Sequence, residues 1–299
     1  MSNSLEPGSA GAWLLASRPK TLPAAVVPVA VGTACAYSLD SASWDAAAAA
    51  LIGALFIQVG TNLANDVYDH EKGADTGDRL GPTRAVQAGL LSPRQVRIGM
   101  AVTFLLASVA GLYLASVAGW QIFAVGVVSI LAGIAYTGGP FPLAYNGLGD
   151  VFVMVFFGFV AVCGTAWVQM GTVPAIAVLA ALPVGALATA MLVVNNLRDV
   201  DTDRLAGKRT LVVRFGRSQA LAQYPSMLLL AYGAVIAMIF VPGGSWAALL
   251  PLLTLPLAFR LHGELRSRSG TALNDTLAGT AKLLLLFGFS LALGLAAGL

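Results

Sequence analysis

The sequence predicts an all-α protein that crosses a membrane about nine times, and three observations lead to this prediction. Of its 299 residues, 58% are hydrophobic and only 10% are charged, and the mean hydropathy is +0.81. Water-soluble proteins carry about 25% charged residues, so this composition excludes a soluble enzyme and a disordered chain. The other two observations are the lengths of the apolar segments and the positions of the basic residues.

The apolar segments have the length that a membrane-spanning helix requires. A helix needs about 20 apolar residues to cross the hydrocarbon core of a bilayer, and the sequence contains nine such segments. They cover roughly residues 21–39, 46–66, 97–118, 120–137, 148–170, 174–195, 220–241, 245–262 and 276–298. Because the connections between them are short, residues 1–299 are expected to form a single transmembrane domain.

The basic residues fall in alternate connections of this nine-span arrangement. The 17 lysines and arginines lie before the first span, between spans two and three, between six and seven, and around the connection from eight to nine. Since basic residues are enriched on the cytoplasmic side of a membrane, this distribution places the N-terminus inside and the C-terminus outside. No basic region precedes the first apolar stretch, so we expect an integral protein of the cell (plasma) membrane without a cleaved signal peptide.

The acidic residues are concentrated in two places. Eight of the 14 fall within residues 66–78 and 199–203, each at the cytoplasmic end of a predicted span. The two clusters align with an offset of 130 residues, which places Asn65 on Asn195 and is consistent with a repeated four-helix unit. Many membrane proteins build their site at the interface between two such repeats. The clusters are therefore candidates for one shared site.

Within each cluster the acidic side chains have helical spacing. Asn62, Asp66 and Asp69 share one face of a helix, and Asp199 and Asp203 are one turn apart. Neighbouring carboxylates repel unless a cation lies between them, and oxygen ligands without Cys or His favour Mg²⁺. The basic residues available to contact phosphate oxygens are Arg79, Arg84, Lys208 and Arg209. This combination at the mouth of an apolar bundle indicates a receptor for a diphosphate with a hydrocarbon tail.

Three other interpretations of these acids are open. Charged residues at helix ends are usually solvated side chains at the membrane interface, although two matching clusters weaken that explanation. A secondary transporter also combines internal repeats with intramembrane acids, but its acids are expected near the bilayer midplane rather than at one face. A lipid-binding module without catalytic activity would not need a second carboxylate motif.

The two Asp-rich motifs resemble those of the UbiA superfamily of intramembrane aromatic prenyltransferases. The second family pattern, D-x-x-x-D, is intact as Asp199 and Asp203. In the first pattern, N-D-x-x-D-x-x-x-D, Gly73 replaces the final Asp and Asp75 follows two residues later. This variant resembles the branch of the family that prenylates 1,4-dihydroxy-2-naphthoate in menaquinone biosynthesis. Further stretches that resemble that branch are residues 18–23, 81–89, 136–140, 147–150 and 195–211.

The resemblance implies a fold and an activity. The fold would be a nine-helix bundle around one central, laterally open cavity, capped by cytoplasmic Asp-motif loops at about residues 67–96 and 196–219. The activity would be Mg²⁺-dependent transfer, with Mn²⁺ as an alternative ion, of a polyprenyl group from polyprenyl diphosphate to 1,4-dihydroxy-2-naphthoate. The naphthoate carboxylate would be lost and demethylmenaquinone formed. The implied partners are these two substrates and the lipid bilayer, with no nucleic acid and no protein partner inferred. A related enzyme with another aromatic acceptor, such as 4-hydroxybenzoate, is the alternative within the family.

The resemblance also implies roles for individual residues. The expected metal ligands are Asp66, Asp69, Asp199 and Asp203, with Asn65, Asn195 or Asn196 and Asp75 as additional ligands. The residues expected to contact the diphosphate are Arg84 and Lys208, then Lys20, Arg79 and Arg209. Tyr136 either stabilises the allylic cation or the leaving group, or belongs to the aromatic belt of the membrane interface. Asp150, a lone acid at the start of a span, is expected to help bind the acceptor.

Overall fold

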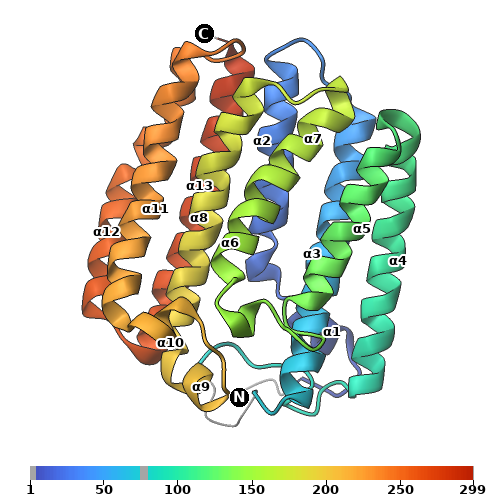
Figure 1. Ribbon diagram of the computed structural model, residues 1–299, viewed down its shortest axis with the longest axis vertical. Coiled ribbons are helices and arrows are strands. Elements are labelled where there is room, and N and C mark those ends of the chain that lie inside the picture. Colours follow the sequence, from blue (N-terminus) through green and yellow to red (C-terminus); the bar gives the residue numbers. More distant parts are fainter. Residues whose placement is uncertain (1–4, 75–79, 299) are drawn as a thin grey trace.

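The computed structural model describes residues 5–74 and 80–298, and in this part of the chain every regular element is a helix (Figure 1). The α-helices are α1 (Ala10–Ser17), α2 (Pro23–Tyr37), α3 (Trp44–Glu71), α4 (Pro93–Ala118), α5 (Trp120–Ala135), α6 (Gly149–Val153), α7 (Ala161–Met170), α8 (Ala175–Arg198), α9 (Val200–Leu205), α10 (Leu211–Phe215), α11 (Arg217–Ala237), α12 (Leu255–Ser267) and α13 (Leu273–Ala297). A π-helical segment, η3 (Met154–Val160), joins α6 to α7, and a 3₁₀ segment, η5 (Trp246–Thr254), precedes α12.

The membrane-spanning units agree with the predicted segments. In the described residues, seven continuous units are long and apolar enough to cross a bilayer. An eighth consists of Ala10–Thr21 and α2, which are bent by 52° at the break before Pro23, where the missing backbone N–H interrupts the helix. The remaining predicted span, residues 120–137, corresponds to α5, an apolar helix of only 16 residues. The all-α membrane bundle is therefore confirmed, whereas the number nine depends on counting the bent pair and the short α5.

The outer face of α4 and α5 carries large apolar side chains. Leu105 of α4 is 65% exposed and Leu131 of α5 is 58% exposed. In Figure 1 these two helices form one edge of the bundle. Such side chains are unfavourable in water and favourable in hydrocarbon, so this edge is a surface that lipid covers.

Helix α8 forms the centre of the opposite half of the molecule. It packs against α11, α13 and η3, and most of its length is buried. At its contact with η3, a Cβ added to Gly158 would lie 2.7 Å from the carbonyl oxygen of Ala181, and one added to Gly185 would lie 2.8 Å from the carbonyl oxygen of Met154. The two glycines thus allow the backbones to approach closely, as small residues do in membrane helix pairs.

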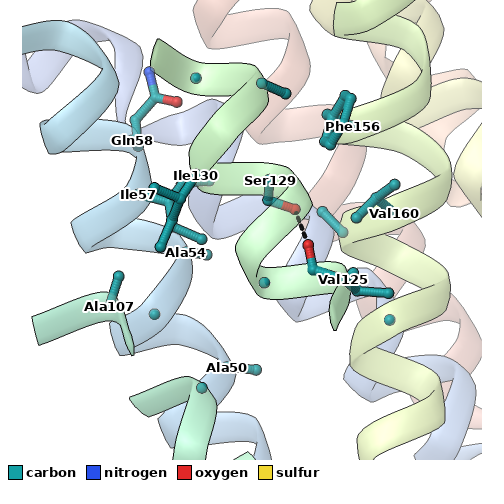
Figure 2. A pocket seen from close by; sticks show the side chains of 18 of the residues that line it. Ala50, Ala54, Ile57, Gln58, Ala107, Val125, Ser129, Ile130, Phe156 and Val160 are labelled. Carbon is teal, nitrogen blue, oxygen red and sulfur yellow. Dashed lines mark hydrogen bonds between the residues drawn. The ribbon is translucent and has the colours of Figure 1, made fainter. Parts of the chain in front are cut away.

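A cavity of about 230 Å³ lies between α2, α3, α4, α5 and the α6–α7 unit. Figure 2 shows its wall, formed by side chains such as Ala54, Ile57, Ile130 and Phe156. The hydroxyl of Ser129 donates to the carbonyl oxygen of Val125 in its own helix at 2.8 Å (Figure 2). The serine and threonine hydroxyls at 108 and 165 likewise donate to carbonyls four residues earlier. The wall therefore presents an almost entirely apolar surface to a ligand.

Both Asp motifs lie at one end of the bundle. The C-terminal end of α3, the α8–α9 junction and α10 are at the same end as α1, and the C-terminus lies at the other end (Figure 1). Ala85 and Val86, which precede α4, contact α3 at this end, and the residues after α9 turn back to it. The fold thus brings the two motifs to one end of the apolar cavity.

Candidate functional site

Asp69, in the last turns of α3, is the point on which the site converges. Its side chain is only 2% exposed. It accepts a 2.8 Å hydrogen bond from the hydroxyl of Tyr145 and a 3.1 Å charge-assisted bond from the guanidinium of Arg84. The ammonium of Lys208 lies 3.5 Å from its Oδ1. Cations from two separate connections of the chain therefore meet at one buried carboxylate.

Lys208 links the first Asp motif to the second. Its Nζ lies 3.5 Å from Oδ1 of Asp69 and 3.5 Å from Oδ1 of Asp203. The residues after α9 turn back, so that the backbone N–H of Lys208 donates to the carbonyl oxygen of Asp203 at 2.9 Å. Burial raises the pKa of Asp203 to about 6, which Lys208 opposes and the carboxylates of Asp199 and Asp69 reinforce. The structure thus brings together three of the residues that the sequence singled out.

Asp199 has a different partner, the arginine that precedes it in the chain. Nε and Nη2 of Arg198 donate to its two carboxylate oxygens at 2.8 and 2.6 Å. The same guanidinium donates to the side-chain oxygens of Asn195 and Asn274, both at 2.9 Å. Because the side chain of Arg198 is only 1% exposed, this is a buried polar network. The sequence prediction did not include Arg198, although its place inside the second motif was a visible signal.

Asp66 contacts the connection between α3 and α4. Its side chain is 1% exposed, and its carboxylate accepts hydrogen bonds from the backbone N–H groups of Ala85 and Val86 at 3.1 and 3.3 Å. These residues directly follow Arg84 in the chain. The two carboxylates of the first motif therefore bind the same turn, Asp66 at its backbone and Asp69 at its arginine side chain.

Lys72 and Tyr145, which the sequence prediction missed, also belong to the site. Lys72 and Lys208 both place their ammonium groups near the ring of Tyr145, at 4.9 and 5.0 Å from its centroid. Lys72 also donates to the carbonyl oxygen of Thr137 at 2.6 Å. Desolvation lowers the pKa of Lys72, Asp69 opposes this and Lys208 lowers it further. Lys72 could have been found from its position one turn after Asp69, but nothing in the sequence connects Tyr145 to either motif.

Tyr136 joins the polar site to the apolar cavity. It follows the last residue of α5 and lines the large cavity. It also lines a small pocket of about 10 Å³, together with Asp150 and Asn196. Asp150 is 7% exposed and accepts a 2.8 Å hydrogen bond from the side-chain amide of Gln223. A ligand in the cavity would therefore reach Tyr136 and, beside it, the pocket lined by Asp150 and Asn196.

Of the other predicted residues, Asn65, Lys20 and Arg209 belong to the described part of the chain. Asn65 accepts a 2.9 Å hydrogen bond from the hydroxyl of Thr137. Lys20 is exposed at the bend between α1 and α2, and Arg209 is exposed after α9. Asp75 and Arg79 lie outside the described residues.

The carboxylates offer an incomplete set of metal ligands. Within residues 5–74 and 80–298, no three acidic, His or Cys side chains are close enough together to enclose a metal ion. The site instead provides two carboxylates, Asp69 and Asp203, with the ammonium of Lys208 between them. Mg²⁺ is commonly held by one or two carboxylates, with water and substrate phosphates completing its shell. The donor set fits an ion of this kind that binds together with a phosphate group.

Known proteins are similar to this chain in sequence, and others are similar to it in fold. The 1,4-dihydroxy-2-naphthoate octaprenyltransferase of Mycobacterium tuberculosis is 38% identical to this chain, over 96% of this chain and 97% of its own length. The enzyme of that name from Escherichia coli is also 38% identical, over 95% and 94%. A structure of a UbiA homologue from Archaeoglobus fulgidus bound to DMAPP and Mg²⁺ superposes with a TM-score of 0.68 at 16% identity, over 96% and 99% of the chains.

The family-level match covers most of the chain. The sequence model of the UbiA prenyltransferase family matches residues 25–286, which include both Asp motifs. Together with the apolar helices, this match identifies an integral membrane protein, and the chain belongs to the UbiA prenyltransferase family.

Proposed function

We propose that this protein is a 1,4-dihydroxy-2-naphthoate polyprenyltransferase. In this reaction the C–O bond between the prenyl group and its diphosphate breaks, a C–C bond to the naphthoate ring forms, and the ring carboxylate leaves as CO₂. The names of the M. tuberculosis and E. coli relatives support this acceptor and an octaprenyl donor. The observation that carries the proposal is an apolar cavity that reaches Tyr136, beside Asp150, at the end of the bundle where Asp69, Asp203 and Lys208 cluster.

The apolar cavity would hold the allylic end of the prenyl chain. Its hydroxyl groups at residues 108, 129 and 165 donate to carbonyls of their own helices, so they do not compete for a ligand. An apolar wall also excludes water, which would otherwise react with the allylic cation before the acceptor does.

The cations around Asp69 would bind the diphosphate. Arg84, Lys72 and Lys208 converge on this point from different parts of the chain. Charge-assisted hydrogen bonds to phosphate oxygens are short and strong, and they strengthen as negative charge develops on the leaving group. The three side chains would therefore favour breakage of the C–O bond.

We infer that Asp69 and Asp203 hold a divalent cation, Mg²⁺ or alternatively Mn²⁺. The position of Lys208 between the two carboxylates indicates that a positive charge is favourable there. When bound, the ion would neutralise part of the charge on the departing diphosphate. The solved homologue with bound Mg²⁺ supports the use of such an ion.

We place the aromatic acceptor beside Tyr136, where Asp150 would accept a hydrogen bond from a ring hydroxyl. The side-chain amide of Gln223 donates to Oδ1 of Asp150, so the position of this carboxylate is fixed before the acceptor binds. A carboxylate at a hydroxyl also increases the electron density of the ring, which favours its attack on the allylic cation. Because both motifs and Asp150 contribute, we treat the chain as one functional domain.

We infer that the end carrying the Asp motifs faces the cytoplasm of the cell. The basic residues are concentrated at that end, in agreement with the positive-inside rule. A C-terminal fusion to alkaline phosphatase, which is active only outside the cytoplasm, is expected to be active. An inactive C-terminal fusion together with an active fusion in the α9–α10 connection would reverse the orientation.

The function can be tested with purified protein in detergent, radiolabelled octaprenyl diphosphate, 1,4-dihydroxy-2-naphthoate and Mg²⁺. We expect a prenylated product and release of CO₂, complete loss of turnover in EDTA, and recovery when Mg²⁺ or Mn²⁺ is restored. Product with 4-hydroxybenzoate but not with the naphthoate would contradict the acceptor. Turnover that survives EDTA would contradict the role of the cation.

A further inference from the structure

The carboxylate of Asp66 has a position unlike that of the other motif acids. Its Oδ2 accepts from the N–H of Ala85 at 3.1 Å and its Oδ1 accepts from the N–H of Val86 at 3.3 Å. Two consecutive backbone donors therefore engage both oxygens of one side chain, which is itself 1% exposed. Each oxygen of this carboxylate therefore has a backbone hydrogen-bond partner without a metal ion, and the two bonds fix its orientation.

The donors belong to a compact turn. The N–H groups of Leu90 and Leu91 donate to the carbonyl oxygen of Ala85, at 2.9 and 3.1 Å. The side chains of Ala85, Val86 and Leu91 are buried and pack in one apolar cluster with residues of α1 and α3. Because water cannot reach the N–H groups at the start of this turn, the carboxylate of Asp66 is what satisfies them.

The same turn delivers a cation to the site. Arg84 immediately precedes the two N–H groups, and its guanidinium donates to Asp69 at 3.1 Å. Asp66 and Asp69 are one turn apart on α3, so one helix holds both the backbone of this turn and the guanidinium of Arg84. A shift of the backbone at Ala85 would carry the guanidinium of Arg84 away from Asp69.

We propose that Asp66 is a positioning residue: it anchors the turn that places Arg84 at Asp69, and it does not ligate the metal ion. This role rests on the proposed function, in which Arg84 binds the diphosphate, and it replaces the metal-ligand role that the motif implied for Asp66. Asp69 and Asp203 then remain as the ligating carboxylates. Of these two acids of the first motif, Asp66 would hold the turn and Asp69 would bind the ion.

The first test compares Mn²⁺ binding in D66N and D69N, measured by electron paramagnetic resonance with a saturating, non-reactive prenyl thiolodiphosphate. We expect D66N to bind Mn²⁺ within about threefold of the wild-type affinity and D69N to bind at least tenfold more weakly. The control is D45N, on the same helix at an exposed position far from the site. Equal weakening in D66N and D69N would overturn the proposal.

The second test measures coupling between Asp66 and Arg84. We expect D66N to raise the KM for the prenyl diphosphate about tenfold, and R84A to do the same. In the double variant the two effects are expected not to multiply, because the asparagine would disturb a turn whose arginine is already gone. If the double variant keeps its fold and its KM rises a hundredfold, Asp66 acts independently of Arg84, which would contradict the anchoring role.

A third measurement uses only the wild-type protein and does not depend on whether D66N folds. Hydrogen exchange of residues 84–91 would be followed with and without Mg²⁺ and the thiolodiphosphate. We expect the amides of Ala85 and Val86 to be protected equally in both conditions, since the carboxylate remains on them. Loss of protection when the ion binds would show that Asp66 moves to the metal. Because no turnover is needed, this result stands even if the naphthoate is not the acceptor.

Discussion

The two Asp motifs have similar spacing but are built differently. Helix α3 continues through Glu71, so that Asp69 is presented from inside a helix. Helix α8 ends at Arg198 and α9 begins at Val200, so that Asp199 lies at a break between two helices. Asp203 is then presented from the separate short helix α9, and the residues that turn back after α9 bring Lys208 to it.

The partners of the two motifs differ accordingly. Asp69 is met by Arg84, Tyr145 and Lys208, which are all distant from it in the chain. Asp199 is met by its neighbour Arg198. We infer that the first motif is the more directly involved in chemistry, whereas Asp199 chiefly stabilises the network that supports Asp203.

The largest expected effect is on the first motif. We expect D69N to lower kcat/KM by a factor on the order of 10²–10³, the loss typical of removing a group that stabilises the transition state. The matched control is D201N in the second motif, whose side chain is 82% exposed and pairs with Arg204. It is expected to stay within about twofold of wild type. The radiolabel transfer assay measures kcat/KM for both variants. A D69N enzyme with more than a tenth of wild-type kcat/KM would contradict the direct role of the first motif in the chemistry.

The fold could be predicted because burial in a bilayer imposes a simple rule on each segment. Apolar runs of about 20 residues and the sorting of the basic residues identify all the helical units from α2 to α13 that cross the bundle. The bend before Pro23 and the π-helical segment at Met154–Val160 could not be predicted in the same way. They depend on how one helix packs on another, as at Gly158 and Gly185.

The site could be predicted only in part. Spacing within a helix reveals which acids share a face, and so Asp69 and Asp203 were found. Tyr145 was not, because its hydroxyl reaches Asp69 only after the chain between α5 and α6 has folded over the end of α3. The alignment of the two motifs could not distinguish Asp66 from Asp69 either, since the turn that separates their roles lies some twenty residues further along the chain.

A second prediction concerns the supporting network of the second motif. Arg198→Ala would leave Asp199 buried without its guanidinium, and breaking a buried ion pair in this way typically costs about 3–5 kcal/mol. We expect a clear fall in the melting temperature in detergent micelles. Arg204→Ala removes the exposed partner of Asp201 and is expected to cost less than about 1 kcal/mol. If R198A melts like R204A, the second motif does not depend on this arginine and the contrast between the motifs is lost.

The smallest expected effect distinguishes the two contributions of Tyr145. Tyr145→Phe removes the hydroxyl that donates to Asp69 but keeps the ring beside Lys72 and Lys208. Losing one hydrogen bond to a charged group corresponds to roughly a tenfold change in KM for the prenyl diphosphate. Tyr145→Leu also removes the cation–π contacts and is expected to raise KM a further fewfold. The matched control, Tyr113→Phe on the exposed face of α4, should leave KM unchanged. If Y145L and Y145F are equal, only the hydroxyl matters. If Y145F is unchanged, Asp69 keeps its orientation without a partner from outside its own motif, and the difference between the two motifs is smaller than their contacts indicate.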